Sequence, residues 1–251
     1  MRSIVMEIPA IERIALVTDF GAGPYLGQMQ AALDACLPDH AVIDLIHDLP
    51  PFRPDLAAYL LPALVRDMPP RTLYLCVVDP GVGGVRDGVI ARIGEDWFVA
   101  PDNGLLAPHL MAGVGQCWRI GWLPPRRSAT FHGRDWFLPV AARLCRGEDV
   151  GPIPLDRPVG HDWPGMLDRV LYADHYGNLM TGLRSADHAQ CLRVGERLLP
   201  WARTFCAVEA GGAFWYENAL GLVEIAVNQG RADRVLGLAP GDPVGPFVMP
   251  E

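Results

Sequence analysis

The feature that most constrains this 251-residue chain is an alternation of apolar runs and helical patterns in its first half. Residues 14–20, 41–49 and 72–79 are short apolar runs of the kind that form strands. Helical patterns follow the first two runs, beginning near Pro24 and Pro54. The third run shows no polar alternation, so we expect it to be covered on both faces. Strands that alternate with helices predict a parallel, doubly wound α/β sheet.

Two of these apolar runs carry an aspartate at or near their carboxyl end. Asp19 lies in VTDFGAG and Asp79 lies in VVDPGVGG. Ligands of open α/β sheets bind beyond the carboxyl ends of the strands, so both acids are candidates for a ligand crevice. Asp19 either accepts hydrogen bonds from a ribose or caps the following helix. Asp79 either contacts a ligand or pairs with Arg86 to brace the glycine-rich turn between them.

A histidine precedes the last helical pattern of the first half. Residues 88–103 predict two strands around Gly94–Asp96, and residues 133–145 predict a helix in which Pro139 is an irregularity. His132 lies just before this helix, between a phenylalanine and a glycine. A typical histidine is a surface or hydrogen-bonded structural residue, but this local context makes His132 a candidate for a functional role.

The composition changes between residues 147 and 165, a stretch with four prolines and no periodicity. This pattern is typical of a linker. Beyond it, the short β-like segments RVLYAD, LMTGL, ARTFCAV, LVEIAV and DPVGPFVMP are separated by turn residues and predict a small β-barrel or sandwich. We therefore expect an α/β domain at 1–150, a proline-rich linker at 151–164 and a small β-barrel domain at 165–251.

The second half contains two further candidate positions. The sequence DHYGN brings together Asp174, Tyr176 and Asn178, which suits a β-turn or a carboxylate, an aromatic face and an amide around one ligand. Sequence alone favours the turn. Glu224 lies within the apolar segment LVEIAV, where a buried carboxylate needs a partner.

Charge and composition exclude several classes of protein. The formal net charge is −8 and the only basic doublet is Arg126-Arg127, which argues against a nucleic-acid partner. The six cysteines are scattered without C-x-x-C spacing, and most have apolar neighbours, which predicts mainly reduced core residues and no structural zinc. No signal peptide opens the chain, and no apolar run approaches the roughly 20 residues that span a bilayer. We expect a cytoplasmic protein with no membrane partner, no metal and no cofactor.

Six segments in order resemble the S-adenosylmethionine (SAM) hydrolases, also called SAM hydroxide adenosyltransferases, which are related to fluorinases and chlorinases. They are TDFGAGPYLGQM, VVDPGVGGVR, APDNGLL, FHGRDWF, DHYGNL and LGLVEIAVNQG, and the resemblance extends from about Ile14 to Val244. The resemblance implies a Rossmann-like N-terminal domain with a parallel sheet, a small C-terminal β-barrel domain and a homotrimer. It also implies substrate sites between the N-domain of one subunit and the C-domain of its neighbour.

The resemblance assigns roles to individual residues. The catalytic set of the family maps onto Asp79, Arg86 and His132, and its ribose-binding acid maps onto Asp19. The other substrate-binding positions, in the pocket wall or near the methionine and adenine parts, are Phe52, Asp174, Tyr176, Asn178 and Asn218. Ala219 stands where the family often has serine, which removes one hydrogen bond worth about 1 kcal/mol near the methionine end.

The implied reaction is hydrolysis of SAM to adenosine and L-methionine by in-line attack of water or hydroxide on C5′. Water has a pKa of about 15.7, so the nucleophile needs a proton acceptor or bound hydroxide. Asp79 and His132 are suited to orient the water and take its proton, and Arg86 to keep Asp79 ionised. The alternatives are a non-catalytic SAM or adenosine sensor, and halide transfer to SAM. A phosphohydrolase is the least favoured, since no second acid or phosphate-binding lysine accompanies Asp79.

Overall fold

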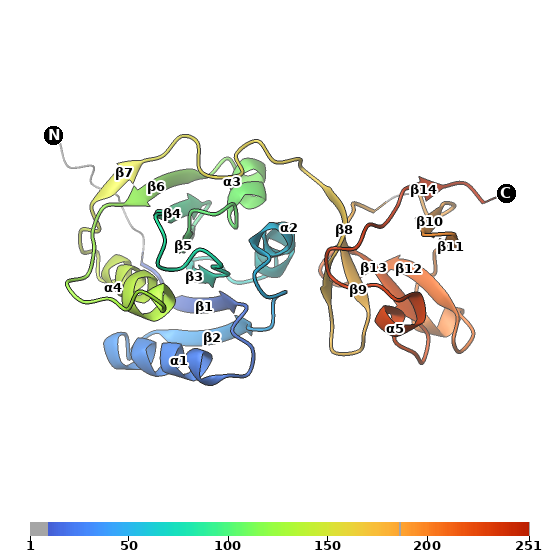
Figure 1. The fold of residues 1–251 in the computed structure, drawn as a ribbon, viewed down its shortest axis with the longest axis horizontal. Coiled ribbons are helices and arrows are strands. Elements are labelled where there is room, and N and C mark those ends of the chain that lie inside the picture. Colours follow the sequence, from blue (N-terminus) through green and yellow to red (C-terminus); the bar gives the residue numbers. More distant parts are fainter. Residues whose placement is uncertain (1–9, 186, 251) are drawn as a thin grey trace. The chain divides into compact units, whose positions relative to one another are not determined.

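The computed structural model describes residues 10–185 and 187–250. They form two compact units (Figure 1). One unit contains the residues up to Ala58 together with Met68–Trp163, and the other contains Tyr59–Asp67 and the residues from Pro164 onward. Each unit has its own cluster of buried apolar side chains.

A mixed sheet forms the centre of the N-terminal unit, and Figure 1 shows it from β2 at the bottom to β7 at the top. Within the described residues its strand order is β2-β1-β3-β5-β4-β6-β7. The strands are β1 Arg13–Thr18, β2 Ala41–Ile46, β3 Thr72–Val77, β4 Gly88–Ile93, β5 Asp96–Pro101, β6 Gln116–Ile120 and β7 Pro152–Pro154. Strands β1, β2, β3 and β5 are parallel, whereas β4, β6 and β7 pair antiparallel. The predicted parallel sheet is therefore confirmed in part, because the short turn between β4 and β5 allows only an antiparallel hairpin.

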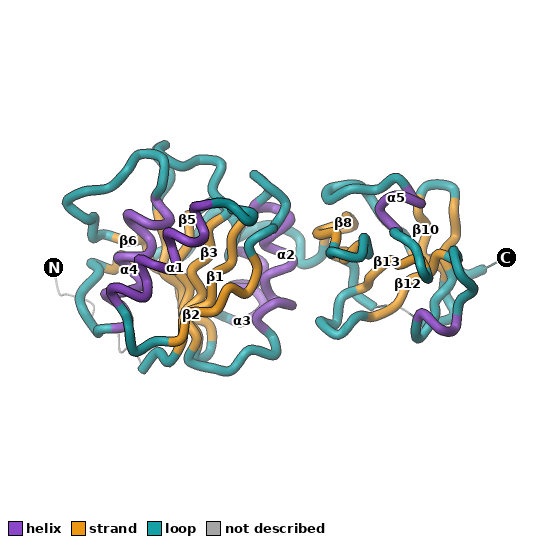
Figure 2. The backbone as a smooth tube through the Cα atoms, turned by 90° about the horizontal axis from the view of Figure 1, so that it is seen from below, coloured by secondary structure: helices purple, strands orange, loops and turns teal. Residues whose placement is uncertain are grey.

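Helices cover both faces of this sheet (Figure 2). The α-helices of the described residues are α1 Pro24–Cys36, α2 Pro54–Val65, α3 Ala107–Gly113, α4 Leu138–Cys145 and α5 Ala232–Leu236. Helices α1 and α4 lie on one face, and α3 and the start of α2 lie on the other. None of the helices in the described residues is both long enough and apolar enough to cross a membrane.

The side chains of β3 confirm that this strand is covered on both sides. Leu73 and Leu75 belong to the apolar cluster that α1 and α4 complete. Tyr74 stacks on Phe98, and the ring of Phe98 contacts His109 of α3 on the opposite face. Successive side chains of a strand point to opposite faces, so an uninterrupted apolar run is what a doubly covered strand requires.

The helix predicted over residues 133–145 consists of two parts. Residues Gly133–Phe137 form a π-helix, in which the Leu138 N–H donates to the Gly133 carbonyl, and α4 follows it directly. Pro139 lies in the first turn of α4, directly after the π-helix, and has no N–H to donate to the preceding turn. The irregularity predicted at Pro139 thus marks the change of helix type, and such π-bulges occur frequently at functional sites.

Part of the predicted linker is structured. Residues 152–154 form β7, which pairs with β6 and completes the edge of the sheet. Strand β6 and helix α3 were not predicted from the sequence. The unit boundary between Trp163 and Pro164 lies near the end of the proline-rich stretch.

Short antiparallel strands form most of the C-terminal unit. They are β8 Leu167–Ala173, β9 Leu179–Gly182, β10 Cys191–Val194, β11 Arg197–Leu199, β12 Ala213–Glu217, β13 Val223–Val227 and β14 Phe247–Val248. They form a four-stranded sheet, β12-β13-β9-β8, and a three-stranded sheet, β11-β10-β14, which do not close into a barrel within the described residues. The predicted β-like character is confirmed, but ARTFCAV contains a 3₁₀-helix at Phe205–Ala207 in place of a strand.

Candidate active site

The register of two neighbouring strands brings the first acids together. β1 and β3 are parallel and adjacent, and Thr18 is paired with Val77 at their carboxyl ends. Asp19 follows Thr18 directly, and Asp79 follows Val77 by two residues, so both acids lie at the same edge of the sheet. The predicted position of these two aspartates at the carboxyl edge is confirmed.

Asp79 and Arg86 form a buried, two-pronged ion pair. The Arg86 Nε–H donates to Asp79 Oδ1 at 2.7 Å, and Nη2 donates to Oδ2. The Asp79 side chain is only 5% exposed, and the Arg86 side chain is 11% exposed. A fork-to-fork pair fixes the orientation of both groups and compensates two charges that would be costly to bury separately.

The turn between Asp79 and Arg86 depends on one glycine in particular. The Val82 N–H donates to the Asp79 carbonyl at 3.2 Å, which closes the first part of the turn. Gly83 has φ +79°, and a Cβ atom at this position would collide with the carbonyl oxygen of Ala129. A left-handed backbone in such close contact with another chain segment requires glycine.

His132 joins the ion pair through Arg86. The Arg86 Nη2 lies 3.0 Å from His132 Nδ1. A guanidinium only donates hydrogen bonds, so Nδ1 is the acceptor and the neutral ring carries its proton on Nε2. His132 is 5% exposed. Burial lowers its pKa, the charges of Arg86 and Arg127 lower it further, and Asp79 and Asp135 oppose the shift.

Two aromatic rings of the π-helix hold this cluster in place. The Arg86 guanidinium lies over the rings of Trp136 at 5.5 Å and Phe137 at 5.0 Å. The His132 ring meets Trp136 edge-on, with centroids 5.3 Å apart. These contacts restrict the rotamers of Arg86 and His132 and reduce access of water to them. The predicted set of Asp79, Arg86 and His132 is thus brought together, with Arg86 in contact with both partners.

Asp19 and Phe52 are linked through the backbone. The Phe52 N–H donates to Asp19 Oδ2 at 3.1 Å. Phe52 has a left-handed φ of 64°, and its ring is exposed. Burial raises the pKa of Asp19, and the nearby charge of Asp79 raises it further. The alternative that Asp19 caps the following helix is wrong, because Gly23 is the N-cap of α1 and no side chain caps it.

A cavity of about 680 Å³ lies in the C-terminal unit. Asp174, Tyr176 and Asn178 all line it, so the structure brings these three predicted residues together. They also form the turn that the sequence favours: the Asn178 N–H donates to Asp174 Oδ1 at 2.8 Å, and Asn178 Nδ2 donates to Oδ2 at 3.0 Å. The turn therefore places these three side chains at the cavity, so a turn and a ligand-facing arrangement are compatible.

Glu224 and Tyr216 line the same cavity, and neither was assigned to the site from the sequence. Glu224 is 3% exposed, with its Oε1 accepting from the Tyr216 hydroxyl and its Oε2 accepting from Asn218 Nδ2 at 2.6 Å. Burial raises the pKa of Glu224, the two hydrogen bonds oppose this, and the charge of Asp174 adds to it. The unusual carboxylate in an apolar strand was the signal that could have identified this position.

The Asn218 amide makes hydrogen bonds within the protein, and its predicted contact with substrate stays a prediction. It does not line the cavity; its Oδ1 accepts from the N–H groups of Leu220 at 2.9 Å and Leu222 at 3.0 Å. Together with its bond to Glu224, these contacts fix the turn that contains Ala219. Asn218 therefore shapes the turn beside the cavity.

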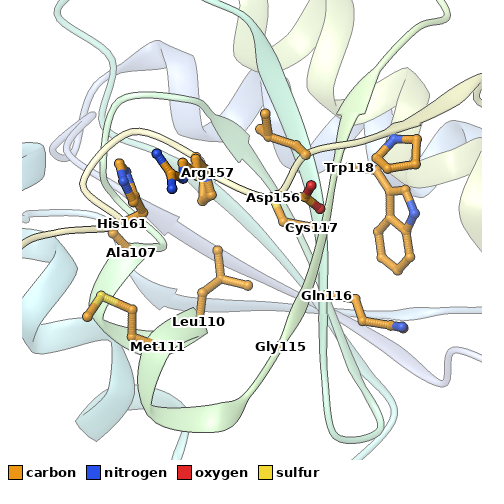
Figure 3. A pocket seen from close by; sticks show the side chains of 13 residues that line it. Ala107, Leu110, Met111, Gly115, Gln116, Cys117, Trp118, Asp156, Arg157 and His161 are labelled. Carbon is orange, nitrogen blue, oxygen red and sulfur yellow. The ribbon is translucent and has the colours of Figure 1, made fainter.

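Two other cavities occur in the N-terminal unit. One, of about 560 Å³, lies between α3, β6 and residues 154–161, with Leu110 on one side and Arg157 and His161 on another (Figure 3). None of the predicted site residues lines it. The other, of about 620 Å³, is lined by both Arg86 and His132. The second cavity therefore gives the acid–guanidinium–imidazole cluster an open side.

Comparison with known proteins gives a consistent picture. The family model described as the SAM hydroxide adenosyltransferase N-terminal domain matches residues 14–153, and that of the C-terminal domain matches residues 168–245. An (R)-S-adenosyl-L-methionine hydrolase from Salinispora arenicola is 37% identical, over 91% of this chain and 95% of the relative. Another from Thermus thermophilus is 38% identical, over 92% of this chain and 98% of the relative. The crystal structure of a conserved Thermotoga maritima protein aligns with a TM-score of 0.82 and 30% identity, over 92% of this chain and 98% of that protein.

Proposed function

Because the chain belongs to the SAM hydroxide adenosyltransferase family, we propose that it hydrolyses S-adenosyl-L-methionine to adenosine and L-methionine. The observation that carries this proposal is the buried cluster in which Arg86 contacts both Asp79 and His132. The relatives named as (R)-S-adenosyl-L-methionine hydrolases, which match more than nine-tenths of the chain, support the choice of substrate.

In the proposed mechanism a water molecule attacks C5′ in line with the sulfonium. The new C5′–O bond forms as the C5′–S bond breaks, and the bonding electron pair passes to sulfur, which leaves as the neutral thioether of methionine. Asp79 accepts the proton of the water, and His132 donates a hydrogen bond from Nε2 to orient the attacking oxygen. Positioning of this kind contributes up to about 7–11 kcal/mol to lowering a barrier.

The role of Arg86 follows from its contacts. Its guanidinium orients the Asp79 carboxylate through two hydrogen bonds, and its bond to Nδ1 fixes the tautomer of His132. A guanidinium close to a cationic substrate is unfavourable alone, and Asp79 offsets that repulsion. This arrangement leaves Asp79 as the proton acceptor and assigns His132 the part of hydrogen-bond donor.

The remaining residues bind substrate in this proposal. Asp19 accepts hydrogen bonds from the ribose hydroxyls, and Phe52 forms an apolar wall. Asp174, Tyr176 and Asn178 contact the methionine and adenine parts, with Asn218 shaping the turn beside them. Ala219 provides no hydroxyl there, which weakens binding of the amino-acid end by about 1 kcal/mol.

The same proposal includes the organisation of the protein. It comprises a Rossmann-like domain at 1–150, a connecting segment at 151–164 and a barrel-like domain at 165–251. The protein acts as a cytoplasmic homotrimer whose sites lie between the N-domain of one subunit and the C-domain of its neighbour. Sedimentation analysis tests the trimer, and a monomer with full activity would contradict it.

The proposed reaction is tested by incubation with SAM in oxygen-18 water. We expect adenosine and methionine in equal amounts, with the label in the 5′-hydroxyl of adenosine. Label in methionine, or intact SAM despite tight binding, would reject hydrolysis at C5′, and the latter would favour a sensor. A parallel incubation with chloride or fluoride tests halide transfer, which would yield 5′-halo-5′-deoxyadenosine.

A further inference from the structure

The cavity of about 620 Å³ beside Arg86 and His132 has features that the proposed hydrolysis does not use. Arg86 and His132 line it, whereas Asp79 does not. Two more arginines, Arg119 and Arg127, line the same cavity. A cavity with three guanidinium groups next to a catalytic imidazole is suited to an anion.

The charges around this cavity are incompletely balanced. Asp79 compensates Arg86 through two hydrogen bonds, and Asp87 lies 3.6 Å from Arg119 in a looser ion pair. None of the ion pairs among the described residues includes Arg127. One positive charge at the cavity therefore has no counter-charge from the described part of the chain.

Arg127 is held at the cavity by an aromatic contact. Its guanidinium lies over the Trp136 ring at 5.3 Å, and Arg86 also lies over that ring, at 5.5 Å. A guanidinium that stacks on an indole keeps its N–H groups free for a ligand in the ring plane of the guanidinium. Arg127 is therefore oriented without an acidic partner.

We propose that this cavity binds a small tetrahedral oxyanion of the phosphate class, with Arg127 as the main contact and Arg119 as the second. The planar fork of each guanidinium matches two oxygens of such an anion, and the anion supplies the missing counter-charge. The binding itself is independent of the proposed hydrolysis. The effect of the bound anion on the rate of hydrolysis rests on the proposed function, because that effect acts through His132.

The effect of a bound anion on the reaction follows from the charges that face His132. Arg86 and Arg127 lower the pKa of the imidazole, and Asp79 and Asp135 raise it. A bound anion adds a negative charge to this environment, so it raises the pKa of His132 and favours the imidazolium. Protonation at Nδ1 removes the acceptor that Arg86 uses, which disrupts the cluster. Bound oxyanion therefore slows the proposed reaction.

The binding is tested by titrating the His132 ring by NMR, without SAM, in the presence and absence of inorganic phosphate. The resonance is assigned by its loss in His132→Gln. We expect saturating phosphate to raise the pKa of His132 by about one unit, the lower end of the shifts that a nearby opposite charge produces. An arm with glycerol 3-phosphate distinguishes free phosphate from a phosphate monoester, and a larger response to either identifies the preferred form of the anion.

The chain offers a matched control, because Arg126 neighbours Arg127 and does not line the cavity. We expect Arg127→Gln to raise the pKa of His132 without phosphate and to abolish the phosphate response, and Arg126→Gln to change neither. Arg127→Lys, which keeps the charge but not the fork, should retain a weaker response. No response in the wild-type protein, or an equal response in Arg127→Gln, would overturn the proposal. Because the readout needs no turnover, failure of SAM hydrolysis would leave this test intact.

Discussion

Asp79 in the N-terminal unit and Glu224 in the C-terminal unit are both buried carboxylates, but their partners differ. Asp79 is paired with a guanidinium that donates to both of its oxygens. Glu224 is surrounded by neutral donors, the Tyr216 hydroxyl and the Asn218 amide. A cationic partner holds a carboxylate ionised, whereas neutral donors only partly offset the cost of burial. The two units therefore surround the same chemical group with different partners: a guanidinium at the proposed reaction centre, and neutral donors at the wall of the cavity in the C-terminal unit.

The largest expected effect is on the first member of this comparison. We expect Asp79→Asn to reduce kcat for SAM hydrolysis by about 10²–10⁴-fold, because the proton acceptor is lost. The free energy of unfolding should also fall, by about 3–5 kcal/mol, because Arg86 remains buried without its counter-charge. Product analysis and denaturant unfolding measure the two effects.

The matched control is the exposed ion pair of Arg53 and Asp55, whose side chains are 40% and 45% exposed. Asp55→Asn should cost less than about 1 kcal/mol and leave kcat unchanged. Equal losses of stability in both variants would show that burial does not distinguish the two pairs. An Asp79→Asn protein with wild-type kcat would remove Asp79 from the mechanism.

The next effect concerns the turn that carries Arg86. We expect Gly83→Ala to destabilise the protein by about 1–3 kcal/mol and to lower kcat, because its Cβ collides with the Ala129 carbonyl and moves the turn. Gly94→Ala is the control: Gly94 also has a left-handed φ, +61°, but nothing lies within 4 Å of the added Cβ. It should cost about 1–2 kcal/mol with no change in kcat. Equal loss of kcat in both variants would contradict the role assigned to the turn.

A smaller effect is expected in the C-terminal unit. Tyr216→Phe removes a donor from Glu224 and should cost about 1–3 kcal/mol of stability. It should raise KM for SAM more than it lowers kcat, because the cavity and not the reaction centre is altered. Tyr176→Phe, at an exposed side chain, should leave stability unchanged. A selective loss of kcat in Tyr216→Phe would place Tyr216 in the chemical step.

The sequence was most informative where a single local rule decides the structure. Asp19 and Asp79 could be assigned to one edge because parallel strands bring their carboxyl ends together. The DHYGN turn could be recognised because Asp, Gly and Asn are the residues that turns require. These rules involve only neighbouring residues or the direction of adjacent strands.

Contacts between distant segments could not be derived from such rules. Nothing local indicates that Arg86 contacts His132, 46 residues away, or that Tyr216 donates to Glu224 across two paired strands. The segment ARTFCAV, with its β-branched and aromatic residues, has a strand-like composition, yet it contains a 3₁₀-helix at Phe205–Ala207. Strand propensity mainly reflects packing against neighbours, and for this segment the tertiary environment outweighed it.

The last expected effect is the pH dependence of stability that Glu224 contributes. Burial raises the pKa of Glu224 in the folded protein above the ordinary value of 4.5. The unfolded protein has the ordinary pKa at this position, and the folded protein has the higher one. Between the two, the folded state binds more protons than the unfolded state, so the contribution of Glu224 to stability falls as the pH rises. Glu224→Gln cannot titrate, so the difference in unfolding free energy between wild type and Glu224→Gln should shift in favour of the variant as the pH is raised from 4.5. Denaturant unfolding at a series of pH values measures this difference. A difference that is constant with pH would mean that the neutral donors of Glu224 compensate its charge as fully as a guanidinium does, and the contrast between the two carboxylates would be lost.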